Sequence, residues 1–122
     1  IDIENYRKSI LEHGNLSSIR TIIDVRDAVE AYWICLKNGK VGEVYNIGGE
    51  ERISVGEVLE LLKKESKTEI ISKQIDSLTR PKDISIQVPN TKKFRDETGW
   101  VPKYSLKESI RFFMDGIRNN YK

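Results

Sequence analysis

The sequence predicts a small α/β domain that is rich in helix and has a few short strands. Two Ser-x-x-Glu capping boxes, Ser54 with Glu57 and Ser105 with Glu108, each precede an amphipathic run of the kind that forms helices. Short β-branched stretches such as 18–23 lie between the helical segments. This alternation favours some parallel strand pairing, but the strands are too few and too short for a full doubly wound sheet.

The individual elements follow from local signals. Helices are expected at 3–11 with Gly14 as its stop, from an Asp24 N-cap to Leu36, from Ser54 onward, from Asn90 or Thr91 to Gly99, and from Ser105 onward. Strands are expected at 18–23, 43–47 and 69–72. The second helix has an apolar side, made of Val25, Val29, Trp33 and Leu36.

The composition limits the class of protein. At 122 residues, 38% of them apolar and 33% charged, the chain has the make-up of one soluble globular domain. Its 21 Lys and Arg against 19 Asp and Glu leave a net charge of +2 without a basic cluster, which argues against a nucleic-acid partner. No apolar run approaches the roughly 18 residues of a membrane helix. The single cysteine, Cys35, fits a reducing cytoplasm, and we expect a cytoplasmic protein.

The usual catalytic and cofactor motifs do not occur in this sequence. It contains no Gly-x-Gly-x-x-Gly, no P-loop and no tyrosine followed four residues later by lysine. His13 is the single histidine, so no histidine-based metal site or catalytic triad can be built from this chain. We therefore predict no catalytic residues and no metal ligands within it.

Arginines supply the candidate chemistry. Arg20 lies inside an apolar strand candidate, an unusual place for a permanent charge unless it meets a ligand or an acidic partner. Arg80 precedes Pro81, which favours an extended backbone at Arg80 and fixes the turn that follows. A guanidinium can bind two phosphate oxygens, and Asp83 could accept hydrogen bonds from the hydroxyls of a ribose. By composition alone, Arg80 and Asp83 could equally form a local surface ion pair.

Three stretches together resemble a known family. They read GNLSSIRTIIDVRDAVEAYW, then GEVYNIGG, then RPKDISIQVPNTKKFRDETGWVPKYSLKESI. In this order and spacing they are similar to the C-terminal part of extended short-chain dehydrogenase/reductases that act on nucleotide sugars, within the NAD-dependent epimerase/dehydratase family. The resemblance is strongest to GDP-mannose 4,6-dehydratase and GDP-4-keto-6-deoxy-mannose reductase, and it covers about residues 13–118.

The resemblance implies roles for particular residues. Seven positions match the family's substrate-binding positions: Arg20 and Arg80 on the diphosphate, Asp83 on the ribose hydroxyls, Asn15 and Leu16 on the nucleotide side, and Val25 and Arg26 as its continuation. Asn90 departs from the family pattern, which commonly has Asp there. Asn can also cap a helix, so the structure should survive this change.

The resemblance also implies an arrangement of domains. Members combine an N-terminal dinucleotide-binding (Rossmann) domain, with a glycine-rich loop and a Tyr-x-x-x-Lys pair, and a smaller C-terminal lobe that holds the substrate nucleotide. Both motifs are absent here, so we expect residues 1–122 to be that lobe, a fragment that lacks the Rossmann half and is inactive alone. NADP is expected in the intact enzyme and no cofactor in this part. The expected partners are a GDP-sugar, the Rossmann domain of the same protein and further copies in a homo-oligomer.

Three functions fit this reading. The first is the substrate-binding domain of a nucleotide-sugar 4,6-dehydratase, with GDP-mannose as the expected substrate. GDP-4-keto-6-deoxy-mannose reductase or another nucleotide-sugar epimerase or dehydratase is the alternative within the same family. A stand-alone nucleotide-binding or interaction module without catalysis is the alternative outside it.

Overall fold

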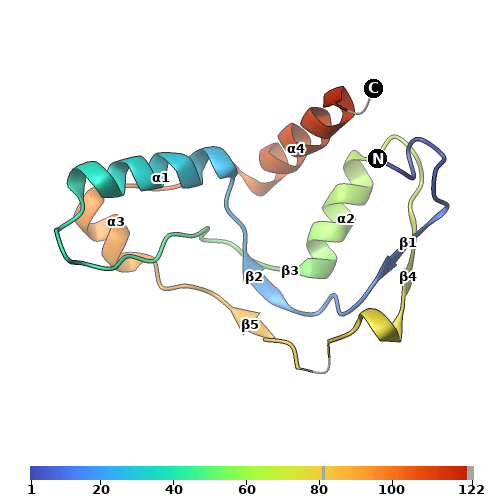
Figure 1. The fold of residues 1–122 in the computed structure, drawn as a ribbon, viewed down its shortest axis with the longest axis horizontal. Coiled ribbons are helices and arrows are strands. Elements are labelled where there is room, and N and C mark those ends of the chain that lie inside the picture. Colours follow the sequence, from blue (N-terminus) through green and yellow to red (C-terminus); the bar gives the residue numbers. More distant parts are fainter. Residues whose placement is uncertain (81, 121–122) are drawn as a thin grey trace.

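The computed structural model describes residues 1–80 and 82–120 and confirms a small, helix-rich α/β fold (Figure 1). Its helices are α1 (Val25–Asn38), α2 (Val55–Glu65), the 3₁₀ turn η1 (Asp76–Leu78), α3 (Lys92–Thr98) and α4 (Leu106–Asn120). Its strands are β1 (Ile10–His13), β2 (Ile19–Thr21), β3 (Arg52–Ser54), β4 (Ile71–Gln74) and β5 (Ile86–Gln87).

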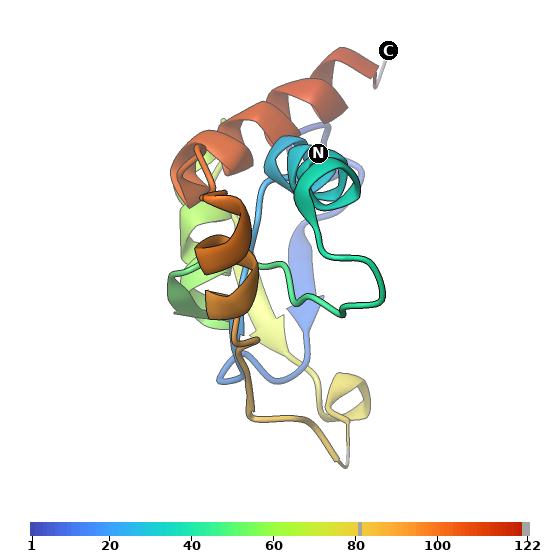
Figure 2. The ribbon, with the colours of Figure 1, turned by 90° about the vertical axis from the view of Figure 1, so that its left-hand side faces the viewer.

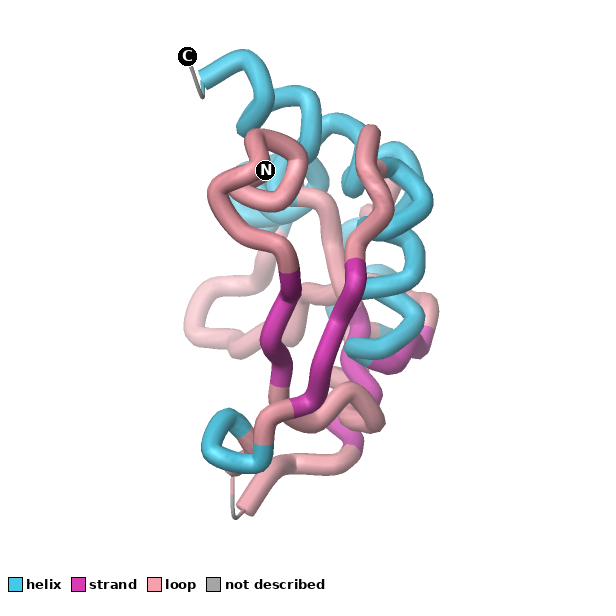
Figure 3. Tube along the Cα trace, turned by 90° about the vertical axis from the view of Figure 1, so that its right-hand side faces the viewer, coloured by secondary structure: helices cyan, strands magenta, loops and turns pink. Residues whose placement is uncertain are grey.

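The strands form two small sheets. β1 pairs in parallel with β4, and the two lie side by side in Figure 3. β2 is the centre of a three-stranded sheet, antiparallel to β3 and parallel to β5. The expected parallel pairing is therefore present. The β2–β5 pair brings the chain after residue 80 beside the chain around residue 20.

The expected N-terminal helix at 3–11 is wrong. Residues 2–6 form a turn, and residues 10–13 are β1. Tyr6 has a positive φ of 57°, which a continuing α-helix does not allow. The parallel pairing of β1 with β4, some 61 residues further along, outweighs the helical spacing of the apolar residues.

The expected strand at 43–47 is also absent, because this segment pairs with no strand among the described residues. Its alternating side chains nevertheless have one buried side. Tyr45 and Ile47 pack against the core that contains Phe94, and the Tyr45 hydroxyl donates to Glu97 Oε2 at 2.5 Å. The alternation of apolar and polar residues thus indicated which side chains face the core, although the segment forms no strand.

Helix boundaries follow the predicted caps. The Ser54 hydroxyl accepts from the Glu57 backbone N–H at 3.1 Å, and Glu57 Oε2 accepts from the Ser54 backbone N–H at 2.8 Å, which completes the capping box of α2. Ser105 and Glu108 make the same reciprocal pair before α4. Gly99 ends α3 in the left-handed conformation at φ 71°.

α1 begins at the predicted cap but buries a different face from the apolar side. Val25, Val29, Trp33 and Leu36 are all more than half exposed. The buried residues of α1 are instead Asp27 and Ala31. α1 therefore presents an apolar face outward.

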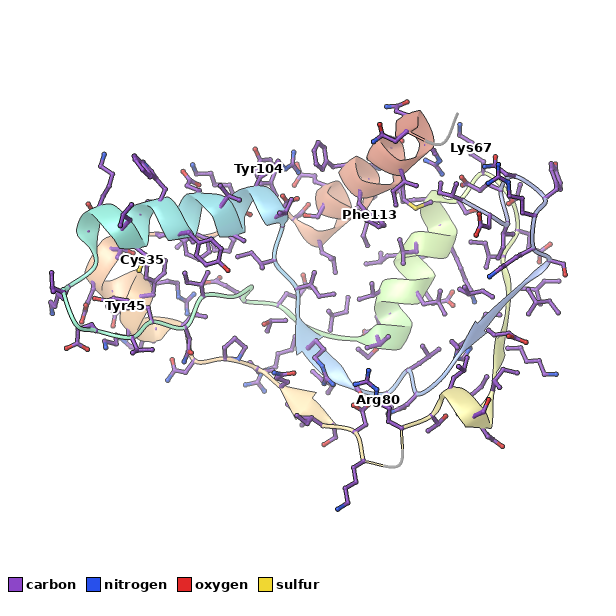
Figure 4. The ribbon with its side chains drawn as sticks, viewed as in Figure 1. Cys35, Tyr45, Lys67, Arg80, Tyr104 and Phe113 are labelled. Carbon is purple, nitrogen blue, oxygen red and sulfur yellow. The ribbon has the colours of Figure 1, made fainter. Side chains whose placement is uncertain are left out.

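The main core lies between α1 and α3. Phe94 is completely buried, with Ala31 and Trp100 beside it. The Phe94 ring meets those of Tyr45 and Trp100 at 5.6 Å between centroids. Figure 2 shows α3 (orange) beside α1 (blue to teal), and Figure 4 shows Cys35 and Tyr45 on the α1 and loop sides of this core.

A buried ion pair holds the two ends of the described chain together. Arg118 on α4 donates to both oxygens of Glu4, at 2.6 and 3.1 Å, and the Glu4 side chain is only 7% exposed. The backbone N–H of Lys67, labelled in Figure 4, donates to the same carboxylate at 2.8 Å. These bonds, above all those from Arg118, lower the pKa of Glu4 to about 2.

This pKa predicts a loss of stability in acid. Glu4 binds protons more weakly in the folded chain than in the unfolded one, so its stabilisation is complete above about pH 4.5 and is lost as the pH falls towards 2. We expect Glu4→Gln to cost on the order of 2 kcal/mol at pH 7 and little at pH 2.5. Thermal unfolding of the unaltered chain and of Glu4→Gln between pH 7 and pH 2.5 measures how the cost of the substitution changes with pH. An equal cost of the substitution at both pH values would contradict the prediction.

Candidate functional site

Four polar side chains gather where the chain after η1 meets the chain before β2. The Asp83 carboxylate accepts from Asn15 Nδ2 at 3.2 Å, from the Ser18 hydroxyl and from Arg20 Nη2 at 3.5 Å. The hydrogen bond from Ser18 is the main reason that the pKa of Asp83 is lowered, followed by those from Asn15 and the charge of Arg20. We call this set the Asp83 cluster.

Arg20 links the Asp83 cluster to an open groove. Its Nη1 donates to the Ile19 carbonyl at 2.7 Å, which turns the guanidinium back along β2. The side chain remains 27% exposed. It borders a groove of about 630 Å³ that Asn46, Gln87 and Pro89 also line. The charge inside the strand thus has an acidic partner, which is one of the two alternatives considered from sequence, and it borders an open groove.

Arg80 lies on the loop that follows η1, close to the connection between β1 and β2 (Figure 4). The end of η1, just before this loop, lies close to Gly14, because a Cβ on Gly14 would be only 2.3 Å from the Leu78 carbonyl oxygen. Arg80 is exposed and forms no ion pair with residues 1–80 or 82–120. The alternative of a surface ion pair between Arg80 and Asp83 is therefore not seen among the described residues. The predicted effect of Pro81 lies outside those residues.

Leu16 anchors the segment that carries the Asp83 cluster. Its carbonyl accepts from the Gly56 N–H at 2.9 Å, and the Ser18 carbonyl accepts from the Val55 N–H at 3.0 Å. Both donors belong to the first turn of α2, whose early N–H groups lack partners within the helix. The turn from Asn15 to Ser18 is therefore fixed to the capped end of α2.

Arg26 contacts residues outside the Asp83 cluster. It forms a bidentate pair with Asp24, at 2.9 and 2.8 Å, and it stacks on the rings of Tyr104 and Phe112, 3.7 and 4.0 Å from their centroids. The hydrogen bonds from Arg26 keep the pKa of Asp24 well below its usual range. The structure thus joins α1 to α4 through Arg26, outside the Asp83 cluster.

Val25 marks the edge of an apolar groove. It is 65% exposed and lines, with Phe113 and Ile117, an open groove of about 650 Å³ between the start of α1, α2 and α4. Phe113 lies between α4 and α2 in Figure 4 and is itself more than half exposed. The predicted site residues are thus divided, with Asn15, Arg20 and Asp83 together and Val25 and Arg26 on a different surface.

Ser18 is a site residue that was not predicted from the sequence. It is 2% exposed, and its hydroxyl lies between Asn15 and Asp83. The Asn-Leu-Ser-Ser order signals a local polar turn. No sequence signal indicates that this hydroxyl reaches a carboxylate 65 residues away.

The part of the chain that the structure describes offers neither a metal site nor a membrane-spanning helix. No three of their His, Cys, Asp and Glu side chains gather in a way that could hold a metal ion. None of their helices has the length and apolar character required to cross a bilayer.

A family model described as GDP-mannose 4,6 dehydratase matches residues 1–113. The fold and the sequence together define a member of the extended short-chain dehydrogenase/reductases that convert nucleotide sugars. The chain belongs to the GDP-mannose 4,6 dehydratase family, as its sequence motifs predicted.

Relatives of known activity agree with this membership. The GDP-6-deoxy-D-mannose reductase of Pseudomonas aeruginosa is 30% identical over 83% of this chain and 33% of its own length. The human dTDP-D-glucose 4,6-dehydratase is 27% identical over 99% of this chain and 36% of its own length. The chain spans about a third of the length of these relatives.

Solved structures share the fold. The structure of RMD from Pseudomonas aeruginosa complexed with NADPH matches 98% of this chain and 39% of that protein, with a TM-score of 0.87 and 26% identity. A dTDP-glucose 4,6-dehydratase from Bacillus anthracis in complex with NAD matches 97% of this chain and 37% of that protein, with a TM-score of 0.82 and 27% identity.

Proposed function

We propose that residues 1–122 form the nucleotide-sugar substrate-binding domain of a nucleotide-sugar 4,6-dehydratase, with a GDP-sugar, first of all GDP-mannose, as the substrate. The observation that carries this proposal is the contact of Arg20 with Asp83, which lie 63 residues apart in sequence, in a partly exposed cluster that includes Asn15. Arg20 and Arg80 bind the diphosphate, and Asp83 accepts from the ribose hydroxyls.

The chemistry of the cluster supports this assignment. Arg80 has no ionic partner among the described residues, and Arg20 has only a long contact with Asp83. Both guanidinium groups can therefore take an anionic ligand without breaking a strong ion pair. A guanidinium binds phosphate oxygens through paired N–H donors, and a carboxylate beside it accepts from neighbouring hydroxyls. A nucleoside diphosphate carries both groups on the same ribose.

The residues of this chain do not fit a nicotinamide cofactor. The sequence contains neither the glycine-rich loop that would hold its pyrophosphate nor a Tyr-x-x-x-Lys pair. We therefore assign no catalytic step to these residues. In the proposed intact enzyme, NADP binds to a separate Rossmann domain, and the chain described here contributes binding energy remote from the reacting carbons. The proposed intact enzyme is a cytoplasmic homo-oligomer.

The outward apolar surface is where we propose that the Rossmann domain packs. Val29, Trp33 and Leu36 on α1 are exposed, and the 650 Å³ groove beside Val25 is lined almost entirely by apolar side chains. A water-exposed apolar surface of this extent is typical of an interaction face. This chain covers less than two fifths of the solved relatives, so each of those proteins has further residues that could form the packing domain.

Nucleotide titration tests the proposed function. In isothermal calorimetry with the intact protein that carries this chain, we expect GDP to bind more tightly than UDP or dTDP. Tighter binding of dTDP or UDP would overturn the choice of a GDP-sugar and leave the nucleotide-binding role in place. Binding of none of the three would overturn the nucleotide-binding role itself.

A reductase acting on a GDP-6-deoxy sugar is the second candidate. It is favoured by the reductase from Pseudomonas aeruginosa, which is 30% identical over 83% of this chain. The two candidates share the GDP moiety and differ in the reaction of the sugar. Product analysis with GDP-mannose separates them, because a dehydratase forms a 4-keto-6-deoxy sugar from it without added reductant.

A further inference from the structure

Ser18 is the least exposed member of the Asp83 cluster and has no role in the family pattern described above. Its 2% exposure makes it one of the most completely buried polar residues of the described chain. A buried hydroxyl costs stability unless it is hydrogen-bonded. This one is placed between Asn15 and Asp83, two residues of the cluster that have an assigned role in substrate binding.

The direction of each hydrogen bond follows from the contacts of Asn15. Its Oδ1 accepts from the Ser17 backbone N–H at 2.9 Å and from the Ser17 hydroxyl at 2.8 Å. The amide nitrogen Nδ2 must therefore face the other way, where it donates to Ser18 Oγ and to Asp83 Oδ2, each at 3.2 Å. Because the Ser18 oxygen accepts from Asn15, its single proton is free to go to Asp83.

The two oxygens of Asp83 are consequently unequal. Among the side-chain donors of the described residues, both Asn15 and Ser18 donate to Oδ2, whereas Oδ1 receives the long 3.5 Å contact from Arg20. The donors to Oδ2 come from a turn that is fixed to α2 by two backbone bonds, from Gly56 and Val55. Asp83 itself lies on a loop, outside any helix or strand. A rigid turn thus holds one oxygen of a carboxylate whose own backbone has less support.

We propose that Ser18 is a positioning residue, which with Asn15 holds Asp83 Oδ2 so that Oδ1 faces the nucleotide beside Arg20 and accepts from a ribose hydroxyl. This inference rests on the proposed function and assigns the ligand's hydroxyl to one oxygen. Ser18 touches the carboxylate and not the ligand, so its effect passes entirely through Asp83.

A comparison of two ligands isolates this effect. In calorimetric titrations of the intact protein, we expect Ser18→Ala to weaken GDP binding about tenfold, the value of one charge-assisted hydrogen bond. Binding of 2′,3′-dideoxy-GDP, which has no ribose hydroxyls, should change less than twofold. The matched control is Ser85→Ala, because the Ser85 hydroxyl lies on the Asp83 loop and bonds to none of the described residues. Ser85→Ala should leave both ligands unaffected.

A double substitution tests whether Ser18 acts through Asp83. In an Asp83→Asn background, Ser18→Ala should have no further effect on GDP binding, because the positioned carboxylate is already lost. Equal weakening of both ligands by Ser18→Ala, or an unchanged affinity for GDP, would overturn the inference while Asp83→Asn still weakens binding and the proposed function stands. Absence of GDP binding by the unaltered protein would overturn both.

Discussion

Replacing Asp27 by Ala should destabilise the chain by about 3 kcal/mol, more than any other single charge removal proposed for it. Asp27 is completely buried near the start of α1. Its Oδ1 accepts from the Lys103 N–H and its Oδ2 from the Tyr104 N–H, both at 3.1 Å. The carboxylate thus ties α1 to the segment that leads into α4, and its removal leaves two backbone donors without partners.

Glu30 provides the matched control for Asp27. It lies about one turn further along α1 and pairs with the side chain of the same Lys103, but the two side chains are 34% and 61% exposed. Exposed pairs contribute at most about 1 kcal/mol, so Glu30→Ala should have little effect. Asp27→Asn, which keeps one acceptor oxygen, should fall between the two. Urea unfolding of the three variants measures their free energies of unfolding. Equal losses of stability in Asp27→Ala and Glu30→Ala would contradict the predicted ranking.

Local capping signals predicted where α1 and α2 begin and where α3 ends. The Ser54–Glu57 pair, the Asp24 cap and the left-handed Gly99 lie where the sequence placed them, because each acts within four residues of the chain. The face that a helix buries depends on distant partners. Asp27 accepts hydrogen bonds from backbone groups 76 and 77 residues away, so the face that α1 buries is not the apolar side that the spacing of its residues defines.

The same limit applies to the strands and to the candidate site. The segment 10–13 becomes β1 only because β4 lies beside it, and the apolar spacing alone fits a helix equally well. Arg20 and Asp83 were predicted by their resemblance to a family motif, which needs no knowledge of contacts. Ser18 carries no such signature, and its bond to Asp83 is visible only once β2 and β5 are paired.

Replacing Arg80 by Ala should weaken the binding of GDP about 10- to 100-fold and leave the stability of the chain unchanged. Arg80 is exposed, so its removal breaks no ion pair and no side-chain hydrogen bond among the described residues. Its proposed partner is the diphosphate, and hydrogen bonds to charged groups contribute about 1.5–3 kcal/mol each. Arg80→Lys should restore only part of the affinity, because an ammonium lacks the paired donors that fit two phosphate oxygens.

Lys82 separates this role from a general effect of positive charge. It is exposed on the same loop and carries the same charge two residues away. If loop charge alone attracted the nucleotide, Lys82→Ala would weaken GDP binding as much as Arg80→Ala, and the loss would shrink strongly with added salt. A specific phosphate contact predicts a loss confined to Arg80→Ala and retained at 0.5 M salt, measured by calorimetry at matched thermal stability. Unchanged affinity in Arg80→Ala would remove Arg80 from the proposed site and leave Arg20 as its diphosphate ligand.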